Sequence, residues 1–394
     1  MSIRFADRIE SLKFPKIEEN YKYWTEDAIS LADGQPDPQY FPVEALKKAF
    51  CEVLSESPAE ALSYGNTEGR PSFRKKISDR VNEKFGAHTT ADQVCLAGGS
   101  QQGLDFVARV LVNEGETIAC EQPSYFGCFQ AFGAVKPKYR AIPTDEDGIL
   151  PAELDKALSE DKSIKLIYVI PNFQNPTGKT WTLERRKAFM EVINKHEIPV
   201  LEDDAYGELR YEGAHLPSLK SMDTKGLVIY SGSFSKIMCP GLRLAYLIAE
   251  EPIYSEIKNV KGNSDMHVPM SIEMMMDKYL DENDLDVHVA NLIKVYREKR
   301  DVMAEAIREF FPKDCVFQVP EGGLFIWVKY PDTYDSKKFF EEAGAQKVIF
   351  VQGELFYAAG ADTNTMRLNF SYAPPETIRE GIRRLGIALE KAKK

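Results

Sequence analysis

Short apolar runs alternate with longer amphipathic stretches through the middle of the chain. Several of these runs are apolar at nearly every position, which is typical of strands buried on both faces of a parallel sheet. They are Val94–Ala97, Thr117–Cys120, Lys165–Ile170, Ile198–Leu201 and Leu227–Tyr230. Helical patterns lie between them, for example at Gln101–Val112 and Leu183–His196. Strands that alternate with helices predict an α/β fold around a parallel sheet.

The last third of the chain has a different pattern. A long charged stretch with helical periodicity runs from about Asp284 to Phe311, and we expect it to carry the chain out of the large domain. Strand-like runs follow, and a final helix begins at about Pro375. The runs are Val316–Val319, Leu324–Val328, Val348–Val351 and Met366–Phe370. This order predicts a second, smaller α+β domain.

Composition narrows the class of protein. A chain of 394 residues is too long for one ordinary hydrophobic core, so we expect two domains. Acidic residues outnumber basic ones by 61 to 50, for a formal charge of −11. This balance argues against a nucleic-acid partner, because such surfaces need clustered lysine and arginine. No apolar stretch has the length of a membrane span, so no membrane partner is expected.

The six cysteines indicate neither a metal site nor an oxidising compartment. No two of them are spaced as C-x-x-C, which argues against a structural zinc site. Unpaired thiols and an N-terminus without an apolar leader favour a cytoplasmic location. The five histidines are scattered and are interpreted as surface or packing residues, so no metal is predicted.

Candidate chemistry follows the run at Leu227–Tyr230, in the segment SGSFSK at residues 231–236. A lysine amine in a partly desolvated pocket loses its proton readily and can form a Schiff base, which suggests this role for Lys236. The small hydroxyl residues before it can donate to a phosphate, and Arg243 is a fixed cation suited to the same group. Alone, the segment also fits a surface lysine in a serine-rich loop.

Acidic residues follow another run, in the segment LEDDAY at residues 201–206. Such residues lie at the carboxyl edge of a parallel sheet, where the ligands of open α/β sheets bind. A buried carboxylate beside a pyridine nitrogen keeps the ring protonated and makes it an electron sink. Tyr206 can donate to the phenolate oxygen of such a ring. Alone, the acids also fit a helix cap with solvated side chains.

Two further turns follow strands. The segment PNFQNPTG at residues 171–178 contains Asn175, whose amide can donate to the same phenolate oxygen, although alone it also fits an ordinary Asn-Pro turn. The segment GGSQQ at residues 98–102 lies between a strand and a helix, where free N–H groups and the helix dipole favour an anion. No G-x-G-x-x-G fingerprint or P-loop is present, so a nucleotide site is poorly supported.

In this order, the four segments resemble the class I and II aminotransferases of pyridoxal-5′-phosphate (PLP) fold type I. The resemblance covers nearly the whole chain. The phrases GGSQQGLD, PNFQNPTG, EDDAYGEL and SGSFSKIMCPGLR are most similar to the 2-aminoadipate/kynurenine aminotransferase branch. Further matching segments are Tyr64-Gly65, Glu68–Arg70, Pro123–Tyr125, Gly322-Gly323 and Arg367–Asn369.

The resemblance implies the fold and the cofactor. The cofactor is PLP, held by a large domain with a mostly parallel seven-stranded sheet flanked by helices, beside a smaller α+β domain. The implied limits are 45–284 for the large PLP-binding domain and 285–394 for the small domain. Residues 1–44 form an N-terminal segment that packs with the small domain and the active site.

The resemblance also implies a role for each site residue. Lys236 forms the Schiff base with the cofactor and moves a proton between the substrate Cα and the cofactor C4′. Asp203 pairs with the pyridine nitrogen, and Asn175 and Tyr206 bind the phenolate oxygen. The remaining cofactor-binding residues are Tyr125, which stacks on the ring, and the phosphate ligands Ser100, Gln101, Ser233, Ser235 and Arg243, with Tyr64 of the partner subunit. The implied substrate-binding residues are Gly34, Asn175 and Arg367, of which Arg367 clamps the α-carboxylate.

The implied function is amino-group transfer from an L-amino acid to a 2-oxo acid such as 2-oxoglutarate, in a homodimer with composite active sites. A PLP-dependent β-lyase or decarboxylase on the same fold would share the cofactor residues, and product analysis separates these activities. Transcription regulators that resemble this branch carry a DNA-binding winged helix ahead of the aminotransferase part. Here the aminotransferase pattern begins within the first forty residues, which leaves no room for one.

The amino donor stays open among aromatic, large aliphatic and 2-aminoadipate-like compounds. In the resembling branch, an N-terminal helix over the site can carry an arginine for a distal carboxylate. The corresponding stretch, residues 14–19, has no arginine and one lysine, Lys16, which puts a strong 2-aminoadipate preference in doubt. Gly34, Tyr40 and the aromatic stretch 21–24 leave room for apolar or aromatic donors, though they also fit packing roles. We therefore expect a broad enzyme, with Lys16 a loose point charge for the distal acid.

Overall fold

The computed structural model describes residues 3–6, 9, 12, 19, 21–358 and 364–394. At its centre is a sheet whose seven described strands follow the order β2-β10-β9-β8-β7-β3-β4. Their bounds are β2 (Val94–Ala97), β10 (Ala245–Ile248), β9 (Val228–Ser233), β8 (Val200–Asp204), β7 (Ile164–Val169), β3 (Thr117–Glu121) and β4 (Lys138–Ile142). Neighbours are parallel except at β10, which runs antiparallel to β9 and β2. The predicted mostly parallel seven-stranded sheet is confirmed.

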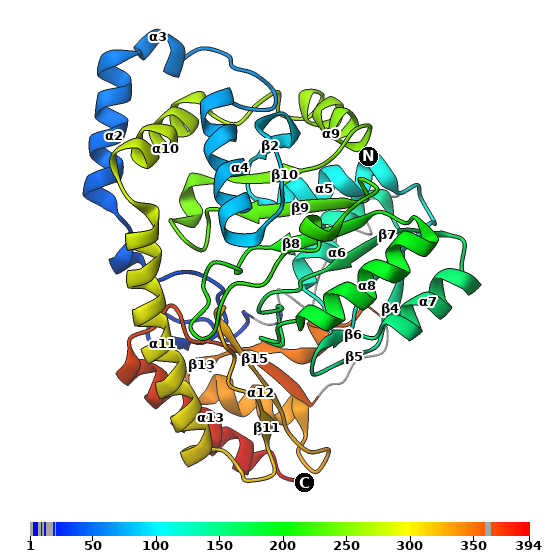
Figure 1. Cartoon of the computed structure of the whole chain (residues 1–394). Coiled ribbons are helices and arrows are strands. Elements are labelled where there is room, and N and C mark those ends of the chain that lie inside the picture. The colour runs from blue at the N-terminus through cyan, green and yellow to red at the C-terminus, as the bar shows by residue number, and fades with distance from the viewer. Residues whose placement is uncertain (1–2, 7–8, 10–11, 13–18, 20, 359–363) are drawn as a thin grey trace.

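Helices cover both faces of this sheet, which explains why its strands are apolar throughout. On β7, Leu166 and Tyr168 belong to a buried cluster with α5, α6 and α9, whereas Ile167 and Val169 belong to a cluster with α7 and α8. Figure 1 shows α7 and α8 in front of the sheet, with α5 and α6 behind it. These helices are α5 (Ser100–Leu111), α6 (Phe126–Phe132), α7 (Pro151–Glu160), α8 (Leu183–His196) and α9 (Ile253–Gly262).

A group of helices packs beside β2 at one edge of the sheet. They are α2 (Val43–Glu56), α3 (Pro58–Ala61), α4 (Pro71–Phe85) and α10 (Met270–Glu282). Val53, Ala61, Met270 and Met274 form a small buried cluster between α2, α3 and α10. The connection from α3 to α4 carries Tyr64, so this group of helices fixes where that side chain emerges.

The last third of the chain forms the predicted α+β arrangement (Figure 1). Its antiparallel sheet has the order β11-β12-β15-β14. The strands are β11 (Val316–Phe317), β12 (Phe325–Lys329), β14 (Val351–Gln352) and β15 (Thr365–Asn369). The helices are α11 (Leu285–Phe310), α12 (Ser336–Ala345) and α13 (Pro375–Lys391), and α11 packs along α13. The domain limits at residues 44 and 284 remain predictions.

The N-terminal region is held against this second part of the chain. Strand β1 (Ile29–Ser30) pairs in parallel with β13 (Val348–Ile349). Beyond it, the buried Lys299 of α11 donates through Nζ to Asp37 Oδ2 at 2.6 Å. Residues 29–37 are therefore fixed by elements more than two hundred residues away in sequence.

Several predicted strands differ from the observed ones; the run Leu227–Tyr230, for example, is β9, which begins at Val228 and continues to Ser233. The run Ile198–Leu201 is β8, but the strand begins at Val200 and continues to Asp204, because its acidic side chains are buried with partners. Val316–Val319 shortens to β11. Val348–Val351 divides into β13 and β14, which pair with β1 and β15 respectively.

The predicted helices agree more closely with the structure. The pattern at Leu183–His196 is α8, and α11 begins just after Asp284, whose side chain caps it. The small hairpin β5 (Thr144–Asp145) and β6 (Gly148–Ile149) carries none of the predicted site residues. Among the described helices, none combines the length and apolar character needed to cross a bilayer.

Candidate active site

Most of the predicted residues meet at the carboxyl ends of β8 and β9, around a cavity of 150 Å³. The cavity is lined by Ser100, Gln101, Tyr125, Ile170, Asn175, Asp203, Ala205, Tyr206, Ser235, Lys236, Pro240 and Arg243. Parallel strands bring their carboxyl ends to one edge of a sheet, so segments far apart in sequence reach the same cavity. Apart from Ile170, Ala205 and Pro240, each lining residue is one that the sequence predicts to bind the cofactor.

Lys236 follows β9 and has a buried amine. Its Nζ donates to the carbonyl oxygen of Gly34 at 2.7 Å. Burial lowers the pKa of Lys236 to about 8, helped by the charges of Arg367 and Arg243 and opposed by that of Asp203. An amine that is neutral at mildly alkaline pH can act as a nucleophile and a base, as Schiff-base chemistry requires.

Asp203 lies near the end of β8 and is almost fully buried. Its Oδ2 accepts a hydrogen bond from Tyr168 Oη at 2.7 Å, whereas its buried Oδ1 has no partner among the described residues. Burial raises the pKa of Asp203 to about 6, with Asp204 adding to the rise and Tyr168 and Lys236 opposing it. A buried, unpaired carboxylate oxygen is costly unless a ligand donates to it. Oδ1 is therefore suited to an N–H donor such as a pyridinium.

Asn175 connects the predicted cofactor site to the predicted carboxylate site. Its Nδ2 donates to Tyr206 Oη at 3.2 Å, and its Oδ1 accepts from Arg367 Nη1 at 3.0 Å. Arg367 Nη2 donates to the carbonyl of Ala32 at 2.6 Å, and its buried Nε has no partner within the described chain. A guanidinium with an unused N–H in a dry site is suited to bind a carboxylate.

Aromatic rings surround the guanidinium of Arg367. Its central carbon lies 4.1 Å from the ring centroid of Phe325, 5.2 Å from that of Phe356 and 5.8 Å from that of Phe126. Cation–π contacts of this kind hold a guanidinium in place while leaving its N–H edge available. The rings also make the surroundings of the carboxylate site largely apolar.

Ser100 and Gln101 begin α5, directly after Gly99. Gly99 has a φ of 98°, and a Cβ at this position would collide with the guanidinium of Arg243. Arg243 Nη2 donates to the carbonyl of Gly98 at 3.2 Å, which holds the cation over the start of the helix. A helix N-terminus with an arginine beside it is a strong anion site. This geometry is suited to an anion, and the role of these residues as phosphate ligands stays a prediction.

Some predicted residues do not line the cavity. Ser233 Oγ accepts from the backbone N–H of Ser235 at 3.1 Å. The carbonyl of Gly34 accepts from Lys236, and Arg367 donates to Asn175, so each contacts a residue that lines the cavity. Tyr64 is 83% exposed, and its ring meets that of His267 edge-on at 5.8 Å. Tyr64 is thus not among the residues that line the cavity of its own chain.

Sequence reasoning missed Tyr168, which contacts Asp203 directly. A tyrosine inside an apolar strand gives no local signal that separates a site residue from an ordinary core residue. The strand register reveals the contact, because Tyr168 pairs with Leu201 and side chains two residues apart on a strand share a face, but a single sequence does not give that register.

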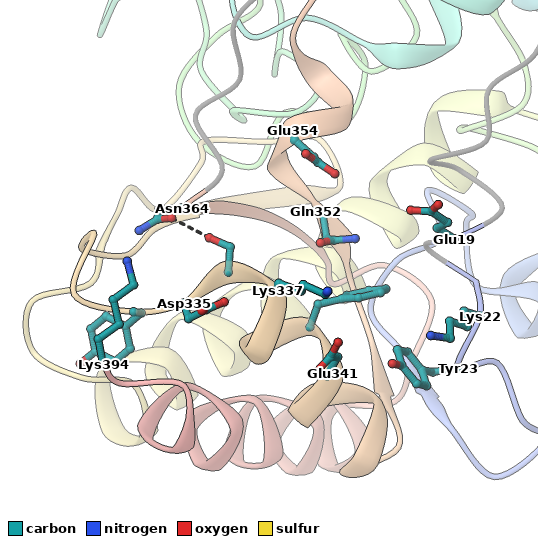
Figure 2. A pocket seen from close by; sticks show the side chains of 13 residues that line it. Glu19, Lys22, Tyr23, Asp335, Lys337, Glu341, Gln352, Glu354, Asn364 and Lys394 are labelled. Atoms are coloured by element: carbon teal, nitrogen blue, oxygen red, sulfur yellow. Dashed lines mark hydrogen bonds between the residues drawn. The ribbon is translucent and has the colours of Figure 1, made fainter.

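A larger cavity of 740 Å³ lies elsewhere, between the N-terminal segment and α12. Figure 2 shows Lys22 and Tyr23 of the N-terminal segment across from Lys337 and Glu341 of α12. Among the described residues that line it, charges of both signs are mixed and none is a predicted site residue. The smaller cavity is therefore the candidate active site.

The side chains of the smaller cavity fit PLP, the cofactor predicted from the sequence. Lys236 offers an amine for its aldehyde, and Asp203 Oδ1 offers an acceptor for its pyridine nitrogen. Asn175 and Tyr206 offer donors for its phenolate oxygen. The start of α5 and Arg243 offer donors for its phosphate. Each polar group of the cofactor thus has a chemically complementary partner in the cavity.

Comparison with known proteins agrees with this geometry. A family model described as "Aminotransferase class I and II" matches residues 26–385. Aromatic-amino-acid aminotransferase 1 of Thermococcus litoralis is 37% identical, over 99% of this chain and 95% of its own length.

Solved structures of similar proteins contain the cofactor in substrate or product complexes. One is a kynurenine aminotransferase of Pyrococcus horikoshii, in complex with PMP and with KYN as substrate and KYA as product. It is 37% identical with a TM-score of 0.94, and the match covers 99% of this chain and 98% of that chain. LysN, the α-aminoadipate aminotransferase of Thermus thermophilus, complexed with N-(5′-phosphopyridoxyl)-L-leucine, is 34% identical with a TM-score of 0.91, covering 98% and 97%.

Proposed function

The chain belongs to the class I and II aminotransferases and is a PLP-dependent transaminase, and from that premise we propose that it uses aromatic and large aliphatic L-amino acids as donors and 2-oxoglutarate as acceptor. The observation that carries the donor preference is the position of Arg367 among aromatic rings. The roles of the site residues, the subunit arrangement and the cellular location are parts of the same proposal.

The proposed roles follow from what each side chain can donate or accept. Bound PLP withdraws electrons from the substrate Cα and so makes its proton acidic. Lys236 removes that proton and returns it at C4′, since its amine is neutral above about pH 8. Asp203 keeps the pyridine nitrogen protonated, and Asn175 and Tyr206 hold the phenolate oxygen. These groups are preorganised by their contacts with the protein, which limits reorganisation during proton transfer.

Arg367 fixes the α-carboxylate that all donors and acceptors share. Its Nε is the unused N–H, and Asn175 holds its Nη1. A bidentate carboxylate on this guanidinium leaves the substrate side chain among the surrounding rings. Apolar and aromatic side chains bury favourably there.

A carboxylate of the protein near this site disfavours a second acid on the donor. Tyr21 Oη donates to Asp33 Oδ1 at 3.2 Å, and both side chains interact electrostatically with Arg367. Like charges brought together in a binding site lower affinity. Lys16, which the sequence predicts as a partner for the distal acid of 2-oxoglutarate, lies outside the described residues.

The donor preference is tested by measuring kcat/KM for phenylalanine, leucine, 2-aminoadipate and glutamate with 2-oxoglutarate as acceptor. We expect phenylalanine and leucine to match or exceed 2-aminoadipate. Asp33→Asn should raise kcat/KM for 2-aminoadipate, glutamate and 2-oxoglutarate and leave that for phenylalanine within about twofold, because only substrates with a second carboxylate are repelled. Lys16→Ala should weaken use of the acidic substrates only. A preference of the unaltered enzyme for 2-aminoadipate of over about a hundredfold, roughly 2.7 kcal/mol, would reject the proposal.

The proposed assembly is a homodimer in which Tyr64 of the partner subunit reaches the phosphate. It is supported by the exposure of Tyr64, Leu62 and Met266, at 83%, 75% and 52%. Large apolar side chains exposed together on one surface mark protein interfaces. The location is proposed to be cytoplasmic, which agrees with six cysteines that are all free.

A further inference from the structure

Tyr168 and Asp203 form a buried pair on one face of β8. Tyr168 of β7 is in register with Leu201, and Asp203 is two residues further along the strand, so both side chains lie on the same face. Tyr168 Oη donates to Asp203 Oδ2 at 2.7 Å. The tyrosine ring is fully buried and meets Phe132 edge-on at 5.6 Å. Packing thus holds the hydroxyl at a fixed point behind the carboxylate.

A second pair of the same kind occupies the opposite face of β8. Tyr230 of β9 is in register with Glu202, two residues before Asp204, and Tyr230 Oη donates to Asp204 Oδ2 at 2.7 Å. Asn172 Nδ2 donates to the other oxygen, Oδ1, at 3.0 Å. Both oxygens of Asp204 are therefore satisfied within the protein.

The difference between the two pairs is the unused oxygen. Asp203 lines the active-site cavity, and one of its oxygens has no partner in the described chain. Asp204 does not line the cavity, and each of its oxygens accepts a hydrogen bond. A hydrogen bond to one oxygen of a carboxylate fixes its rotation, so Tyr168 decides which oxygen faces the ligand.

We propose that Tyr168 is a positioning residue for the cofactor's pyridine nitrogen. It holds Oδ1 of Asp203 towards the cavity and makes the carboxylate a weaker base, so that the shared proton stays on the ring. This inference rests on the proposed role of Asp203.

The direction of the effect follows from hydrogen bonding to an ionised group. A donor to a carboxylate favours its charged form, and Tyr168 accordingly lowers the pKa of Asp203 against the larger effect of burial. Burial raises the pKa of Tyr168 itself well above its usual value, so its hydroxyl stays a donor at working pH. Without that donor, the carboxylate draws the proton from the ring nitrogen, and the ring withdraws electrons less strongly.

The test compares Tyr168→Phe with the unaltered holoenzyme, reconstituted with PLP that carries ¹⁵N at its ring nitrogen. The substitution keeps the ring and removes only the hydroxyl. We expect the ¹⁵N resonance to move downfield, towards the position of neutral pyridine. We expect kcat to fall on the order of tenfold, the equivalent of one pKa unit, while KM stays within about twofold.

Tyr230→Phe is the matched control, because it removes a hydroxyl of equal burial and hydrogen-bond length from the other pair. Its unfolding midpoint should fall about as much as that of Tyr168→Phe, with the ¹⁵N resonance unchanged and kcat within about twofold. An unmoved resonance in Tyr168→Phe, or an equal loss of kcat in both variants, overturns the inference. If the unaltered enzyme already shows a neutral ring nitrogen, the role of Asp203 itself is wrong, and the inference falls with it.

Discussion

The two adjacent acids Asp203 and Asp204 have different surroundings because successive side chains on a strand face opposite sides of the sheet. Asp203 faces the cavity with one unpaired oxygen. Asp204 is equally buried, but Asn172 and Tyr230 satisfy it. The sequence alone predicts a milder effect from losing Asp204. The structure adds that this loss should act on stability rather than on turnover.

We predict that Asp203→Asn lowers kcat at least about a hundredfold, roughly 2.7 kcal/mol of transition-state stabilisation, with a smaller loss of unfolding free energy than Asp204→Asn, because Asp203 has one buried donor and Asp204 has two. Asp204→Asn should keep most of the turnover and lose about 1–3 kcal/mol of unfolding free energy, because buried donors lose a charged acceptor. Steady-state kinetics and urea unfolding of both variants measure this. Equal and mild effects on turnover would contradict the assignment.

The pKa of Lys236 leads to a prediction about pH. In the apoenzyme, reductive methylation of Lys236 should rise through a midpoint near pH 8, because only the neutral amine reacts and burial lowers its pKa. Asp203→Asn should move the midpoint down, since the carboxylate raises this pKa. Arg243→Met should move it up, since the guanidinium lowers it. Peptide mapping by mass spectrometry follows the label, and a midpoint near the ordinary 10.5, or shifts in one common direction, would refute the prediction.

At the scale of single residues, side chains with distinctive chemistry could be predicted from the sequence, whereas the residues that support them could not. Lys236, Asp203 and Asn175 stand in short polar segments directly after apolar runs, so their sites are visible in the sequence. Tyr168 lies inside such a run and looks like a core residue, and Glu121 directly follows the run Thr117–Cys120 without any sign of which loop it holds. Their contacts depend on the pairing of neighbouring strands, which a single sequence does not give.

The loop from Ile170 to Trp181, which carries Asn175, is anchored at both ends by Glu121 of β3. Ile170 N donates to Glu121 Oε2 at 2.9 Å, and Trp181 Nε1 donates to Oε1 at 3.0 Å. Within the loop, Gln174 Nε2 donates to the carbonyl of Pro123 at 2.8 Å. One buried carboxylate thus fixes the positions of both ends of the loop relative to the sheet.

We predict that Glu121→Gln lowers kcat/KM about tenfold, because an amide N–H would face the N–H donors and shift Asn175 away from Arg367. Glu202→Gln is the matched control. Glu202 is also fully buried and accepts two backbone N–H groups, those of Leu219 and Lys220, both of which lie outside this loop.

Both variants should lose stability by similar amounts, about 1–3 kcal/mol, and thermal unfolding will show it. Only Glu121→Gln should change kcat/KM. Equal kcat/KM values for the two variants would mean that Glu121 serves the core alone.

At the scale of elements, the sequence predicted order and type better than ends. The expected strand at Ile198–Leu201 stopped at the first acid, but β8 continues through Glu202, Asp203 and Asp204 because each has partners inside the fold. The run Val348–Val351 is apolar throughout, so nothing in it marks the division between β13 and β14. That division comes from β1 and β15, which pair with the two halves separately.

The whole molecule is proposed to act as a dimer, and mixed subunits test this. Tyr64→Phe and Lys236→Ala chains should each have low activity. When they are unfolded together and refolded in equal amounts, about a quarter of the sites should combine an intact Lys236 with an intact Tyr64 of the partner subunit. Activity should therefore recover towards a quarter of that of the unaltered enzyme.

Light scattering of the unaltered enzyme provides the control for assembly. A fully active monomer would reject the composite site. So would a mixture whose activity does not exceed the average of the two separate variants.

The pairing of β1 with β13 has a consequence for synthesis on the ribosome. Ile29 emerges about 320 residues before its partner Val348, which at common translation rates is a delay on the order of half a minute. Arg367, which needs the carbonyl of Ala32, appears later still. The nascent chain can complete its large sheet while residues 29–37 wait for their partners, so the carboxylate clamp is the last part of the active site to form within one chain. An incomplete polypeptide is therefore expected to hold cofactor before it can hold an amino acid.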